Sequence, residues 1–80
     1  MAAMTRAKTP VVVFADKPDR NGYWATTDGR WKAKDRRVRG QPATVTLTDT
    51  TRRAVFAETG ASWIRLPDWA TVRTVIAAHR

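Results

Sequence analysis

Tyr23-Trp-Ala-Thr-Thr-Asp-Gly-Arg-Trp-Lys-Ala-Lys34 is the stretch of sequence that decides the fold. Asp28-Gly29 lies between two runs that are compatible with β-strands, and this arrangement is a strong signal for a tight hairpin. A two-residue turn fixes the strand register, so that Trp24 lies opposite Ala33. We therefore expect an antiparallel hairpin over residues 23–34.

This register divides the hairpin into an apolar face and a basic face, because residues that lie opposite one another share a face. The division supports the register independently, and it predicts tryptophans inside and cations outside. The apolar face carries Trp24, Thr26, Trp31 and Ala33, whereas the basic face carries Tyr23, Ala25, Thr27, Arg30, Lys32 and Lys34.

Further segments complete the predicted sheet and its helix. Residues 11–15 form an apolar run that predicts a strand buried on both faces. Residues 43–48 alternate, with Val45 and Leu47 inward, and residues 53–58 are expected to return beside them. With an even-length loop, Val45 faces Phe56 and Leu47 faces Ala54.

A short strand over residues 62–66 should place Ile64 inward and Trp63 outward. Pro67 and Asp68 then favour a helix start, with proline suited to the first helical position. The residues at helical spacing form one apolar stripe, which consists of Trp69, Val72, Val75 and Ile76.

The predicted fold is α+β, with an antiparallel sheet of about four to five short strands packed by one C-terminal helix. The alternative is a small, partly open β-barrel capped by the helix. Residues 1–9 are expected to be a disordered tail and residues 10–80 a single small domain. The chain has no cysteine and no apolar run of membrane-spanning length, so we expect a cytoplasmic protein with no membrane partner.

The charge is strongly unbalanced, with fifteen Lys and Arg against seven Asp and Glu and a net charge of +8. Such an excess favours polyanionic partners, which are nucleic acid (DNA or RNA) or an acidic protein surface. Six of the cations fall within ten residues, offset only by Asp35, and alternate β-residues lie about 6.6 Å apart, so the cluster can follow a phosphate backbone. These six are Arg30, Lys32, Lys34, Arg36, Arg37 and Arg39. The competing explanation is a solvated edge strand whose cations discourage aggregation.

Two aromatic residues, Tyr23 and Trp63, are expected on the same outer face as the cations, together with Arg53 and Arg65. An open sheet face of this composition is typical of single-strand binding, because bases stack on the rings while cations hold phosphates. The same composition is typical of protein-binding hot spots. If the sheet curls into a barrel, Trp63 is buried instead. The outward threonine row Thr44, Thr46 and Thr48 is explained by β-propensity.

The sequence does not favour catalysis, a cofactor, a metal or a small-molecule substrate. The only histidine, His79, is the penultimate residue and is expected to be a solvated cation. One histidine and no cysteine exclude a conventional zinc site, and no phosphate-binding glycine motif occurs. We therefore expect a non-enzymatic binding protein.

Arginine outnumbers lysine eleven to four, and Ala, Thr, Val and Asp are abundant. This composition resembles that of small proteins from actinobacteria and their phages. The resemblance implies, as an alternative to nucleic-acid binding, a phage-type accessory module that binds and inhibits a host protein. A third hypothesis is self-assembly through the strand edge near residues 11–15.

Overall fold

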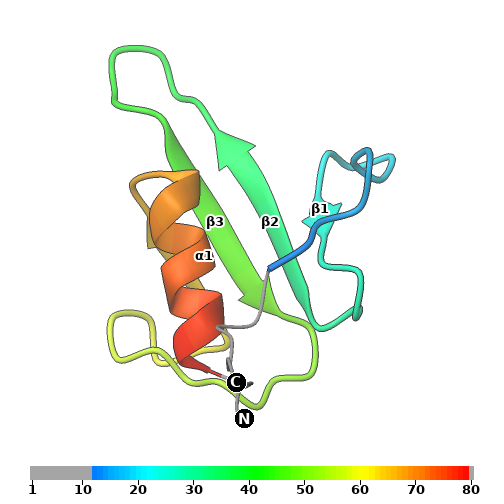
Figure 1. The fold of residues 1–80 in the computed structure, drawn as a ribbon. Coiled ribbons are helices and arrows are strands. Elements are labelled where there is room, and N and C mark those ends of the chain that lie inside the picture. The colour runs from blue at the N-terminus through cyan, green and yellow to red at the C-terminus, as the bar shows by residue number, and fades with distance from the viewer. Residues whose placement is uncertain (1–11, 80) are drawn as a thin grey trace, which may run out of the picture.

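One antiparallel sheet with a helix on one side makes up the fold (Figure 1). The computed structural model describes residues 12–79, so the predicted tail over residues 1–9 lies outside the described residues. The strands lie in the order β1-β2-β3-β4, each neighbouring pair is antiparallel, and the sheet is open. The predicted α+β class is confirmed, and the barrel alternative is wrong. The elements are β1 (Trp24–Ala25), β2 (Trp31–Arg36), β3 (Thr44–Asp49), β4 (Trp63–Leu66) and α1 (Trp69–Ala78).

The first hairpin has the register that the sequence predicts. Trp24 pairs with Ala33, and Ala25 pairs with Lys32. Because side chains alternate along a strand, this pairing puts the buried Ala33 and the half-buried Trp24 on one face and Lys32 on the other.

The turn of this hairpin is longer than the predicted two residues. The last backbone bond of the ladder joins Thr26 N to Trp31 O at 2.9 Å, which leaves a four-residue loop over residues 27–30. Gly29 within it has a φ of 80°, a conformation that glycine adopts without steric cost. Thr27 and Arg30 lie in this loop and do not pair as strand residues, so Arg30 does not follow the alternation of β2.

β2 and β3 form the longest ladder, which runs from the pair Trp31–Asp49 to the pair Arg36–Thr44. A turn at the far end is closed by a bond from Gln41 N to Val38 O at 3.0 Å. β4 reaches along β3 only as far as Val45, so the β2–β3 connection extends beyond the rest of the sheet (Figure 1).

The predicted strand over residues 53–58 is wrong, because β4 occupies that edge of β3. The buried Asp49 side chain at the end of β3 accepts a hydrogen bond from Ala54 N at 2.8 Å, which bends the chain away from the ladder. Ala54 and Phe56 are nevertheless buried, and Val55 is 69% exposed between them.

The predicted strand over residues 11–15 is reduced to a single bridge between Phe14 and Thr26, and Val11 lies outside the described residues. Bonds from Ala15 N to Ala25 O and from Thr27 N to Val13 O hold the segment beside β1. Val13 is 46% exposed, so the prediction of burial on both faces is wrong. The segment lies at the sheet edge, where only one neighbour can cover it.

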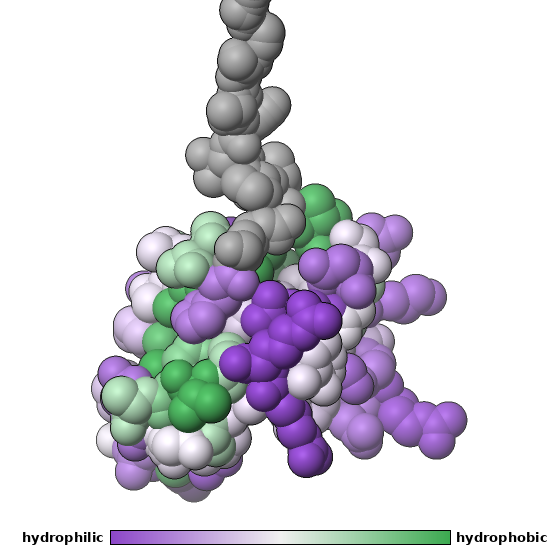
Figure 2. Space-filling model, turned by 90° about the horizontal axis from the view of Figure 1, so that it is seen from below, coloured by the Kyte–Doolittle hydropathy of each residue, from purple (hydrophilic) through white to green (hydrophobic). Residues whose placement is uncertain are grey.

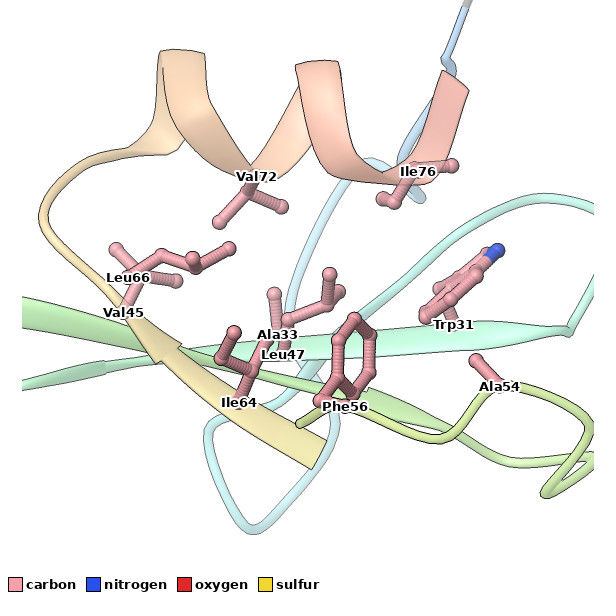
Figure 3. Packing of buried hydrophobic residues seen from close by; sticks show 10 residues of the cluster. All are labelled: Trp31, Ala33, Val45, Leu47, Ala54, Phe56, Ile64, Leu66, Val72 and Ile76. Atoms are coloured by element: carbon pink, nitrogen blue, oxygen red, sulfur yellow. The ribbon is translucent and has the colours of Figure 1, made fainter. Parts of the chain in front are cut away.

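α1 covers one face of the sheet and closes the core (Figure 3). Val72 and Ile76 point from α1 toward the sheet, as the helical spacing predicts, and Trp69 and Val75 are partly buried beside them. The predicted inward positions of β3 and β4 are confirmed. The core consists of Trp31, Ala33, Val45, Leu47, Ala54, Phe56, Ile64, Leu66, Val72 and Ile76.

The helix begins two residues later than the sequence suggests, at Trp69 instead of Pro67. Asp68 is the N-cap, and its carboxylate accepts a hydrogen bond from Thr71 N at 2.8 Å, so Pro67 precedes the helix instead of opening it. Hydrogen bonds from the hydroxyl and the backbone N–H of Thr71 lower the pKa of Asp68. None of the helical structure within residues 12–79 has the length and apolar character that spanning a bilayer requires.

Candidate nucleic-acid interface

The face of the sheet opposite α1 is not covered by any helix of the described chain, and we call it the open face. Successive side chains of a strand point to opposite faces, and α1 packs on one of these faces. The side chains that point away from α1 form the open face. From one edge to the other, the open face comprises Tyr23 before β1, Lys32, Lys34 and Arg36 on β2, Thr44, Thr46 and Thr48 on β3, and Trp63 and Arg65 on β4.

The strand pairing orders these side chains into rows that cross the sheet. One row runs from Lys32 through Thr48 to Trp63. The neighbouring row runs from Lys34 through Thr46 to Arg65. In both rows a threonine on β3 lies between a lysine on β2 and either Trp63 or Arg65 on β4.

Most of the cations on the open face keep their charge available to a ligand. Lys32 Nζ lies 3.9 Å from Asp19 Oδ2, in a pair whose side chains are 45% and 39% exposed. Such an exposed pair neutralises little charge. A hydrogen bond from Tyr23 N lowers the pKa of Asp19 and keeps it ionised. Among residues 12–79, no carboxylate forms an ion pair with Lys34, Arg36 or Arg65.

The two aromatic residues of the open face have different surroundings. Trp63 is 39% exposed and therefore does not belong to the core. Tyr23 is half-buried, and Lys34 Nζ lies 5.2 Å from the centroid of its ring. Tyr23 thus holds Lys34 through a cation–π contact, whereas Trp63 offers a ring to a ligand.

A groove of about 680 Å³ opens on this face. It brings together Tyr23, Trp63, Arg65 and three of the six clustered cations, which the sequence predicts to share a surface. It is lined by Tyr23, Lys34, Asp35, Arg36, Arg37, Val38, Thr46, Thr48, Trp63 and Arg65.

Arg30 does not belong to the open face, and its predicted place on the basic face of the hairpin is wrong. Its guanidinium donates to both carboxylate oxygens of Asp49, at 3.3 Å from Nε and 3.1 Å from Nη2. Its Nη1 donates to His79 O at 3.0 Å, at the end of α1. Burial raises the pKa of Asp49, but hydrogen bonds from Arg30, Thr51 and Ala54 outweigh it and hold that pKa well below its usual range. Arg30 therefore stabilises the fold.

The remaining predicted cations lie in loops. Arg37 lines the groove, and Arg39 occupies the exposed turn next to Gly40. Arg53 lies in the loop after β3, next to the buried Ala54, and no contact within residues 12–79 joins it to the open face. Figure 2 looks at the end of the molecule that carries the loop after β3, and it shows strongly hydrophilic side chains beside an apolar patch.

Asp35, the one acid of the basic cluster, faces the helix side of the sheet. Its Oδ1 accepts a hydrogen bond from Trp69 Nε1 at 2.9 Å. Asp35 pairs with the buried Val45 in the β2–β3 ladder. It lines the groove only at its edge, where the open face meets the side of the sheet that α1 covers. The cations on either side of it in β2 consequently dominate the open face.

The His79 side chain is half-buried, so the solvated position that the sequence predicts for it is wrong. Its ring packs 5.8 Å from the ring of Trp31 and 5.3 Å from that of Phe56, centroid to centroid. Its Nδ1 lies 2.9 Å from Val75 O. Within the described chain, no three His, Cys, Asp or Glu side chains gather as metal ligands.

The threonines of β3 are the residues of this surface that sequence reasoning left without a role. Thr46 and Thr48 line the groove between the cations and Trp63. The signal was their alternate spacing beside a basic strand, but the sequence does not show which strands are neighbours. No protein-family model, curated protein or solved structure matches this chain.

Proposed function

We propose that this protein binds single-stranded nucleic acid across the open face. The observation that carries the proposal is the order of side chains across the sheet, with cations on β2, threonines on β3 and the exposed Trp63 on β4. Phosphate, sugar and base follow one another in the same order across a nucleotide.

The dimensions of the sheet support this match. Strands lie about 4.8 Å apart, so β2 and β4 are separated by about 10 Å. A single strand laid along β3 would place its phosphates against Lys34 and Arg36 and a base against Trp63. Successive phosphates would meet alternate residues of β2, which lie about 6.8 Å apart in an antiparallel strand.

Trp63 supports a single-stranded ligand in particular. Its ring is exposed, and the bond from Thr59 Oγ1 to Trp63 O at 2.6 Å holds its backbone. A base stacks on such a ring only when its own face is free, as it is in a single strand. Base–aromatic stacking contributes about 1–3 kcal/mol per base.

Fluorescence anisotropy with a labelled single-stranded 12-mer tests the proposal. We expect oligonucleotide binding to quench the tryptophan emission. If three phosphates are neutralised, the logarithm of the association constant should fall with the logarithm of the salt concentration with a slope of about −2. Trp63→Ala should weaken binding about tenfold. The combined reversal of Lys34, Arg36 and Arg65 to glutamate should abolish binding and leave the circular-dichroism spectrum unchanged. Arg30 is not a suitable target, since its loss would destabilise the fold.

Arg65→Glu and Arg53→Glu form a matched pair, because each changes the net charge by the same amount and both side chains are exposed. If the open face binds the ligand, Arg65→Glu weakens binding far more than Arg53→Glu. Equal effects of the two changes would refute a localised site. Failure of every single-stranded and double-stranded oligonucleotide to bind would refute the function itself.

A further inference from the structure

The row of threonine hydroxyls on β3 has no partner within the described chain. No hydrogen bond among residues 12–79 uses the hydroxyl of Thr44, Thr46 or Thr48. Other threonines do use theirs: Thr50 Oγ1 donates to Arg30 O at 2.7 Å, and Thr74 Oγ1 donates to Ala70 O at 3.2 Å. The row on β3 therefore presents a line of free donors and acceptors.

These hydroxyls lie between the two groups of side chains to which the proposed function assigns phosphate and base. Thr46 stands between Lys34 and Arg65, and Thr48 stands between Lys32 and Trp63. All three threonines are half-buried, so their short side chains form the floor between longer neighbours. The part of a nucleotide that reaches this floor is its sugar.

We infer that the threonine row contacts ribose 2′-hydroxyls and that the ligand is RNA in preference to DNA; this inference rests on the proposed function. A threonine hydroxyl donates one hydrogen bond and accepts others, and the ribose 2′-hydroxyl can do both. Deoxyribose offers no such group. The repeat of about 6.8 Å between alternate residues of β3 lets successive sugars meet Thr48, Thr46 and Thr44.

The test compares labelled oligo(U) and oligo(dU) 12-mers, which differ only in the 2′-hydroxyl. The full chain should bind oligo(U) about 3- to 10-fold more tightly than oligo(dU), as two or three partly solvated hydrogen bonds would give. The combined change of Thr44, Thr46 and Thr48 to valine should remove this preference, so that the ratio of the two affinities falls to about one. Valine keeps the shape of threonine and favours strands, so the sheet should be retained.

Two further variants make the comparison specific. The same three positions changed to serine keep the hydroxyls and should keep the preference for oligo(U). Thr74→Val, on an exposed position of α1, removes a hydroxyl elsewhere and should change neither affinity. Equal binding of oligo(U) and oligo(dU) by the wild type, or an unchanged preference in the valine variant, would overturn the RNA inference and leave nucleic-acid binding standing. Failure of both 12-mers to bind would overturn the RNA inference, and failure of every other oligonucleotide as well would refute the proposed function.

Discussion

Asp49→Asn removes the acceptor that joins three parts of the chain, and we expect it to destabilise the fold strongly. The Asp49 carboxylate is fully buried and accepts hydrogen bonds from Arg30, from the backbone and hydroxyl of Thr51, and from Ala54 N. Asparagine keeps the volume, but it turns an NH₂ group toward these donors and leaves Arg30 without a counter-charge. Breaking a buried ion pair from one side costs about 3–5 kcal/mol.

The magnitude lies toward the lower end of that range, because the Arg30 side chain is 21% exposed and can recover some hydration. We expect a loss of about 3 kcal/mol in the free energy of unfolding. A domain of this size is stabilised by amounts near the lower end of about 5–15 kcal/mol, so most of the stability would be lost. The midpoint of thermal unfolding should fall by about 12–24 °C.

Urea unfolding followed by tryptophan fluorescence measures this loss, since the Arg30 guanidinium lies 4.8 Å from the centroid of the Trp31 ring and reports on the same region. Lys32→Ala is the matched control, because Lys32 forms the exposed ion pair of the same hairpin and its removal should leave the urea midpoint nearly unchanged. A loss below about 1 kcal/mol for Asp49→Asn would refute the assignment of a stabilising role to this pair.

Three more outcomes follow from individual side chains. The pKa of Asp49 is lower in the folded protein than in the unfolded chain, so the unfolded chain binds the proton first as the pH falls. The free energy of unfolding of the wild type should therefore decrease below about pH 4. Urea titrations from pH 6 to pH 2 should show that Asp49→Asn lacks this part of the decrease. Arg52 has a φ of 61°, so Arg52→Gly should raise stability by about 1 kcal/mol in the same assay, and a lower urea midpoint would contradict this. Asp35→Asn removes a carboxylate from the rim of the groove and should tighten oligonucleotide binding about twofold in anisotropy titrations, whereas weaker binding would count against a polyanionic ligand.

The parts of the fold that were predicted correctly are those set by local pattern. Asp28-Gly29 set the first register, and the alternation of Ile64 and Leu66 fixed the inward face of β4. The spacing of Val72 and Ile76 identified the buried side of the helix. Each of these signals lies within a few residues of the structure that it specifies.

The errors arose where distant segments compete for the same position. Residues 53–58 and 62–66 have similar alternation, and both can pair with the free edge of β3. Loop length alone favours residues 53–58, because they are nearer to β3 in sequence. The hydrogen bond from Ala54 N to the buried Asp49 carboxylate bends this segment away, and β4 pairs with β3 instead. The sequence does not show that Asp49 is buried. A carboxylate is rarely buried unless it is paired, and the partner of Asp49, Arg30, lies 19 residues away in sequence.

The candidate site was predicted in part for the same reason. Alternation along β2 correctly grouped Lys32, Lys34 and Arg36, which share the open face. Arg30 was wrongly included because its partners, Asp49 and His79, lie 19 and 49 residues away in sequence. The position of Trp63 beside the threonines likewise depends on the neighbours of β3, which no local pattern specifies.

The contact between Arg30 and His79 O at the end of α1 joins segments that are synthesised at different times. During synthesis the hairpin strands leave the ribosome before Val72 and Ile76, the residues that cover them. Until then, the apolar side of the sheet has no cover, and it is open to association with other nascent chains. The core can therefore close only after α1 has been synthesised, when the Arg30 guanidinium can reach His79 O.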